Sequence, residues 1–372
     1  MMEDPALELT TQSKQEYNFL RSGEMTPAMA AEYLRDGKIH TRSFHETLRR
    51  LYPAPDLQAR ITAAFQADDP DANPESVARR VRNWMSGQNH PVNREDIFRI
   101  AFALGLSEGD ASLLLGLCTD YGIHYREGRD VVYAWFLRTG RSYAQARDFF
   151  ATLPPVPRPN LPPEAPSAHL TRELQSLFHR ARDEDELRQC YLASLDQFGA
   201  LHMRAYFYFQ KYLDQLVHPA PAWDSGREAD YSMDAIMEQY FSLHMPSGRN
   251  RQNYSVVQKL IKRDWPNTTA LKNIRQQRED VPRKLLLLLY VVTENVLDGE
   301  YCEMDEDYIT PQERLEDHWW TLNAILTDCG MPLLDLRNAT DWLVLYALTA
   351  TGDESVSERM EKVIDELFAD VR

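Results

Sequence analysis

The stretch that decides the fold is SVARRVRNWMSG, residues 76–87. At 100° per residue its apolar side chains gather on one helical face, and they are Val77, Val81, Trp84 and Met85. The opposite face is polar and carries Arg79, Arg82, Asn83 and Ser86. The pattern therefore predicts an amphipathic helix that packs on a core and turns a basic face outward.

A second helix is predicted directly downstream, in IFRIAFALGLS at residues 97–107. Its apolar residues repeat at helical spacing, as in Ile97, Ile100, Ala101 and Leu104. Strict alternation over the length of a strand is scarce in the rest of the chain, whereas helical spacing recurs throughout. We therefore expect an all-α fold of two helical-bundle domains.

Residues 42–118 resemble the helix-turn-helix domains of Cro/XRE-like repressors. The resemblance lies in the helix ending in Ser86-Gly87, in Pro91 and Arg94 after it, and in residues 97–107. It implies that residues 76–87 form a recognition helix in the major groove of DNA. Arg79 and Asn83 are then candidates for base edges, because Arg pairs with guanine and Asn with adenine through two hydrogen bonds. Arg94 is the candidate for a phosphate contact.

Two observations favour a different interpretation of this motif. Between the expected helix at residues 57–65 and the next one near Glu75, nine residues (66–74) stand where the motif has three or four. This segment is also acidic, which disfavours a place near phosphates. In the alternative interpretation, the helix with three arginines is simply a solvated face.

The two halves of the chain show a weak internal duplication. Four pairs of segments match in the same order, namely residues 119–123 with 327–331, 129–137 with 340–348, 93–102 with 281–290, and 32–34 plus 43–48 with 190–192 plus 206–213. The duplication predicts that Asp130 and Asp341 occupy equivalent helix N-termini, where a carboxylate caps free amides and meets the positive end of the helix dipole.

The second copy contains its own helix, turn and helix, at residues 255–263, 264–267 and 268–278. Its outward residues are Thr269, Lys272, Asn273 and Gln276. Residues 252–278 are basic, so Lys272, Asn273 and Gln276 are candidates for DNA contacts, and a local solvated face is an equal alternative.

Charge and proline content divide the chain. Residues 153–166, LPPVPRPNLPPEAP, carry seven prolines, which favours an extended linker over a helix. We therefore expect a helix-turn-helix domain at residues 1–152, a linker at 153–168 and a helical domain at 169–372. Residues 1–150 hold 18 Lys or Arg against 21 Asp or Glu, whereas residues 169–372 hold 22 against 35. The acidity thus belongs to the second half.

The remaining sequence signals exclude several classes of protein. The four cysteines are far apart and no phosphate-loop, zinc-protease or nucleophile-elbow pattern occurs, so we expect no metal, no cofactor and no enzyme activity. The chain begins without a secretory signal, and its longest apolar run, residues 285–292, suits a buried helix better than a membrane span. A cytoplasmic location is therefore expected.

The sequence as a whole favours a DNA-binding transcriptional regulator. Its expected partners are duplex DNA for the first domain, and a protein partner or self-association for the acidic second domain. The alternative is a helical protein-interaction module, in which both copies keep the fold and no longer bind DNA.

Overall fold

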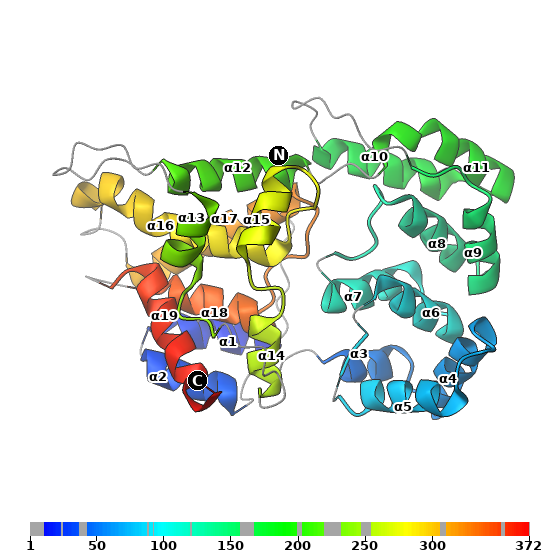
Figure 1. Cartoon of the computed structure of the whole chain (residues 1–372), viewed down its shortest axis with the longest axis horizontal. Coiled ribbons are helices and arrows are strands. Elements are labelled where there is room, and N and C mark those ends of the chain that lie inside the picture. Colours follow the sequence, from blue (N-terminus) through cyan, green and yellow to red (C-terminus); the bar gives the residue numbers. More distant parts are fainter. Residues whose placement is uncertain are drawn as a thin grey trace. The chain divides into compact units, whose positions relative to one another are not determined.

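The computed structural model describes residues 11–23, 25–36, 43–87, 89–91, 93–119, 121–156, 167–198, 203–218, 232–246, 254–305, 310–350 and 354–371. Every regular element within these ranges is a helix, which confirms the predicted all-α fold. Residues 157–166 of the proline-rich linker lie outside the described residues. Figure 1 shows the helices in chain order.

The chain forms two compact units. The central unit comprises residues 42–204 and 328–332, and the terminal unit comprises residues 1–41, 205–327 and 333–372. This division differs from the expected boundary at residues 153–168. The reason is that residues 167–204, which follow the linker, belong to the same unit as residues 42–156, whereas residues 1–41 belong to the unit of residues 205–327 and 333–372.

The central unit contains nine α-helices within its described residues. They are α3 (Phe44–Leu51), α4 (Leu57–Asp68), α5 (Pro74–Met85), α6 (Arg94–Leu104), α7 (Glu108–Cys118), α8 (Gly128–Arg138), α9 (Tyr143–Ala151), α10 (Ser167–Arg180) and α11 (Glu184–Ala193). Side chains from all nine helices meet in one core, including Ile61, Val81, Ile97, Trp135 and Phe178. Helices α10 and α11 therefore belong to this unit, although the linker precedes them in the sequence.

The terminal unit is built from both ends of the chain. Its helices are α1 (Thr11–Arg21), α2 (Pro27–Arg35), α12 (Met203–Val217), α13 (Met233–Ile236), the π-helix η2 (Met237–Phe241), α14 (Val256–Lys262), α15 (Thr268–Arg275), α16 (Arg283–Asp305), α17 (Pro311–Asp328), α18 (Ala339–Ala347) and α19 (Val356–Leu367). Figure 1 shows α2, in blue, beside α19, in red.

Residues 285–292 lie in α16 and are all buried, with at most 5% of any side chain exposed. The interpretation of this run as a core helix is confirmed. No helix in the described part of the chain is long and apolar enough to cross a membrane.

Candidate nucleic-acid interface

The turn between α4 and α5 is shorter than the sequence indicated. Helix α4 continues to Asp68, and α5 begins at Pro74, so five residues connect them instead of the expected nine. The Asn73 side chain accepts hydrogen bonds from the backbone N–H groups of Glu75 and Ser76, and Pro74 occupies the first helical position, where its missing N–H costs nothing. The turn of five residues is close to the three or four of the motif, so its length is only a weak argument against a helix-turn-helix.

Helix α5 has the two faces that its sequence predicts. Val77, Val81, Trp84 and Met85 are buried. Arg79, Arg82 and Ser86 are exposed and Asn83 is partly exposed. Within the described residues, neither Arg79 nor Arg82 forms an ion pair. Arg80 differs, since its guanidinium lies over the rings of Phe65 and Trp84, at 4.9 and 5.3 Å from the ring centroids. Two arginines of this helix are thus available to an anionic partner.

Helix α3 adds basic residues beside the C-terminal end of α5. The Arg49 guanidinium donates a hydrogen bond to the Met85 carbonyl oxygen at 3.2 Å, and the neighbouring Arg50 is exposed. The end of α5 approaches α3 closely at Gly87, which has φ of +74° and where a Cβ would lie 2.7 Å from the His45 ring. Sequence reasoning missed Arg49, because its helix precedes α5 by more than twenty residues and only packing joins the two.

The acidic turn before α5 is partly neutralised within the unit. Asp68 lies 3.4 Å from the Arg99 guanidinium and 3.9 Å from that of Arg147. Burial raises the pKa of the Asp68 carboxyl above its usual range, against the opposing effect of both arginines. Asp69 and Asp71 remain exposed on the turn. The surface near α5 therefore carries both signs of charge.

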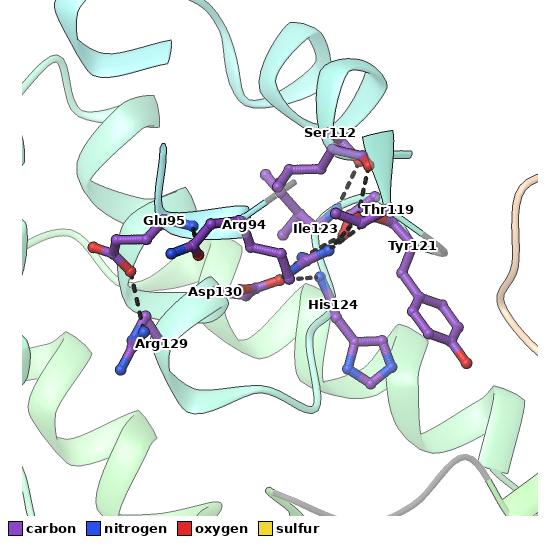
Figure 2. A network of polar contacts seen from close by, with 12 residues as sticks. Arg94, Glu95, Ser112, Thr119, Tyr121, Ile123, His124, Arg129 and Asp130 are labelled. Atoms are coloured by element: carbon purple, nitrogen blue, oxygen red, sulfur yellow. Dashed lines mark hydrogen bonds and ion pairs between the residues drawn. The ribbon is translucent and has the colours of Figure 1, made fainter. Parts of the chain in front are cut away.

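Arg94 belongs to an internal network of polar contacts (Figure 2). One terminal nitrogen of its guanidinium donates to the Thr119 hydroxyl and the Tyr121 carbonyl, each at 2.9 Å. The other donates to the Gly122 carbonyl at 2.7 Å and to the Asp130 carboxylate. These internal partners give Arg94 a structural role that the sequence did not indicate, and its phosphate contact stays a prediction.

Asp130 is the buried partner of Arg94, with 5% of its side chain exposed. Its carboxylate also accepts the backbone N–H of His124 at 3.0 Å, as Figure 2 shows. Burial raises the pKa of Asp130, while Arg94 and the His124 N–H act in the opposite direction. The residue lies in the first turn of α8 as expected. Its partners, however, are an arginine and the amide of a loop residue that precedes α8.

The candidate residues of the second copy are engaged with acidic side chains. Lys272 on α15 forms an ion pair with Asp234 at 3.0 Å, and Asn273 donates to Glu279 at 2.7 Å. Gln276 is exposed at the C-terminal end of the helix. The eight candidate residues thus lie on three helices and their ends, with Arg79, Arg82, Asn83 and Ser86 on α5, Arg94 at the start of α6, and Lys272, Asn273 and Gln276 on α15. The four on α5 form the largest accessible group.

Among the described residues no cluster of three or more His, Cys, Asp or Glu side chains has an arrangement that could hold a metal ion. Comparison of the chain with protein-family models gives no match. Comparisons with curated proteins and with solved structures give none either.

Proposed function

We propose that the central unit binds duplex DNA through the exposed face of α5. The observation that carries this proposal is the outward face itself, where Arg79 and Arg82 stand without ion pairs in the described residues and flank Asn83. Arginine and asparagine are the side chains best suited to read guanine and adenine in the major groove. In this proposal Arg49 and Arg50, at the end of α3, contact the adjoining phosphates.

The packing around α5 supports this proposal. Helix α4 packs against both α5 and α6, while α3 packs against α5 and α7. In this proposal α5 acts as the second helix of a helix-turn-helix, held from behind by the neighbouring helices with its polar face outward. A groove-reading helix needs such rigid support, because base contacts depend on its orientation.

The division of charge also favours DNA binding by the central unit. Residues 42–204 and 328–332 hold 20 Lys or Arg against 22 Asp or Glu, so the central unit has a net charge of −2. The terminal unit holds 21 against 35, a net charge of −14. A polyanion is repelled by the second far more than by the first.

For the terminal unit we propose a regulatory role through a protein partner or self-association. Lys272 and Asn273 are already bonded to Asp234 and Glu279, so these two candidates on α15 are less available to DNA than Arg79 and Arg82 are on α5. The protein would thus act by binding rather than by catalysis, as a transcriptional regulator.

The test uses the full-length chain, because fragments 1–150 and 169–372 would each cut through a compact unit. A selection from random duplexes should enrich a motif, and binding to it should weaken steeply with salt as counterions are released. The double variant Arg79→Ala/Arg82→Ala should lose at least tenfold in affinity. Arg182→Ala, at an exposed arginine of the same unit, is the matched control.

No enriched motif, together with no mobility shift at low salt, would contradict the proposal. The helical protein-interaction module would then be the better interpretation of both units.

A further inference from the structure

The two units contain the same buried ion-pair network. In the terminal unit, Arg283 donates to both carboxylate oxygens of Asp341, at 2.7 and 2.8 Å, and to the Leu333 carbonyl at 3.1 Å. Asp341 also accepts the backbone N–H of Asp335 at 2.8 Å. Around Arg94 in the central unit, the bonds to the aspartate, to the loop carbonyl and from the loop N–H have counterparts, although Arg94 donates to only one oxygen of Asp130. In both networks the arginine begins one helix and the aspartate is the third residue of another.

The correspondence extends to the preceding loops. The Ile123 N–H donates to the Ser112 hydroxyl and the Leu334 N–H donates to the Asn323 side-chain oxygen, both at 2.9 Å. Corresponding members of each pair are 211 residues apart, as are Asp130 and Asp341. With a spacing of 211 residues, residues 119–123 correspond to 330–334 instead of 327–331, a shift of three positions. Pairing Arg94 with Arg283 shifts the match of residues 93–102 by one position, to residues 282–291. The shifts arise because sequence letters alone do not show which residue makes each bond.

A further pair of equivalent hydrogen bonds joins α8 and α18 to helices that take no part in these networks. The Trp135 indole N–H donates to the carbonyl of Ala181, which lies between α10 and α11. The Tyr346 hydroxyl donates to the carbonyl of Met25, which lies between α1 and α2. Both bonds are 2.9 Å long, and Trp135 and Tyr346 are again 211 residues apart. The pair α1–α2 thus takes in the terminal unit the place that α10–α11 takes in the central unit.

Chain order makes this equivalence informative. Helices α1–α2 precede the body of the first copy, α3–α9, and helices α10–α11 precede the body of the second copy, α12–α19. Each helix pair nevertheless packs on the body of the other copy. The chain is therefore two repeats that have exchanged their leading helix pairs.

We propose that the surface formed by α17, α18 and α19 is a docking site for a two-helix segment. Its occupant is the N-terminal clasp, which we define as residues 11–35 (α1–α2), and a second copy of this chain can supply the same segment. The argument for this occupant is the exchange itself. Because the leading helix pair of each repeat packs on a body other than its own, the pair of one molecule can also pack on the body of another. We call the surface formed by α17, α18 and α19 the seat. Within the described residues, only the continuous backbone links the clasp covalently to the seat.

The seat contacts the clasp through a column of aromatic rings. Tyr33 of the clasp stacks on Trp342 at 5.5 Å between ring centroids, and Trp342 stacks on Tyr346 at 5.6 Å. The Arg359 guanidinium lies over the Tyr346 ring at 4.5 Å and donates to the Met25 carbonyl at 3.1 Å.

Apolar burial and polar contacts at the edge complete the interface. The buried apolar side chains of the clasp are Leu20, Met25, Ala30, Ala31 and Leu34. At the edge, Arg21 pairs with Glu316 at 3.2 Å and Arg35 donates to the Glu366 carbonyl. The site thus combines an apolar centre with a polar rim, as separable protein interfaces do.

The test is a full-length chain with a protease site inserted between Asp36 and Ser43. After cleavage, the clasp fragment should stay bound during gel filtration at micromolar concentration, and a fluorescent peptide of residues 11–36 should exchange into the seat. Leu34→Ala should weaken retention and peptide binding at least tenfold, because Leu34 is fully buried. Met29→Ala is the matched control, since Met29 lies on the same helix and is 50% exposed.

Loss of the fragment upon cleavage would overturn the proposal. Equal effects of Leu34→Ala and Met29→Ala would overturn the assignment of the seat. A separate experiment tests whether a second copy can supply the clasp. The cleaved protein is mixed with an excess of intact tagged chain, and the mixture is taken into mild denaturant and back out of it. The tagged chain should then co-purify with cleaved chains, and complete absence of mixed species would overturn the exchange. None of these outcomes depends on DNA binding.

Discussion

Replacing Arg283 by Met tests whether the buried ion pair holds the terminal unit together. Asp341 is 1% exposed and the Arg283 side chain is 11% exposed, so the substitution leaves a buried carboxylate without its counter-charge. It removes two charge-assisted hydrogen bonds to Asp341 and one bond to the Leu333 carbonyl. Asp341 keeps only the Asp335 N–H among these partners.

The expected loss is about 3 to 5 kcal/mol in the free energy of unfolding of the terminal unit, the range found when one partner of a buried pair is removed. The double variant Arg283→Met/Asp341→Asn should recover about 2 kcal/mol of this loss. It removes the buried charge and keeps an acceptor for the Asp335 N–H.

The assay is urea unfolding followed by hydrogen exchange of individual peptides, because a protein of two units need not unfold in one transition. Exchange should accelerate in peptides of α16, α18 and α19 and stay unchanged in peptides of α4 to α6. A loss below about 1 kcal/mol, or equal destabilisation of both units, would refute the assignment of Arg283 to the core of the terminal unit.

Three further predictions concern other parts of the chain. Arg94→Met should destabilise the central unit by about 2 to 4 kcal/mol in the same assay, somewhat less than Arg283→Met because the Arg94 side chain is 30% exposed; an effect seen only on DNA affinity would contradict this structural role. Gly87→Ala should cost the central unit about 1 to 2 kcal/mol, measured by its urea midpoint, since alanine is strained at φ of +74° and its Cβ would meet His45. Burial lowers the pKa of His318 from 6.5 to about 4, so the unfolded chain takes up a proton at this residue before the folded chain does. The terminal unit should therefore lose up to about 3 kcal/mol as the pH falls from about 6.5 to about 4, and a His318→Gln variant that shows the same pH dependence as the wild type would contradict this reasoning.

The sequence by itself determined the fold class and the faces of the helices. Apolar spacing in residues 76–87 gave both the buried and the exposed side of α5, and the run at residues 285–292 gave a core helix. These features are local, because a residue's place around a helix depends only on its position within that helix. The same reasoning placed Asp130 and Asp341 in the first turns of α8 and α18.

Only the tertiary structure decided which partners these residues meet. Arg94 looked like a surface residue at a helix start, and it is held by Asp130, thirty-six residues further along the chain. Helices α1 and α2 likewise belong to the unit of residues 205–327 and 333–372, and α10 and α11 to that of residues 42–156, across the expected boundary. An amphipathic helix specifies that its apolar face must be covered, but many apolar surfaces satisfy that requirement. Which surface covers it depends on the shape and polar contacts of the assembled bundle, such as the carbonyl of Met25 that receives Tyr346.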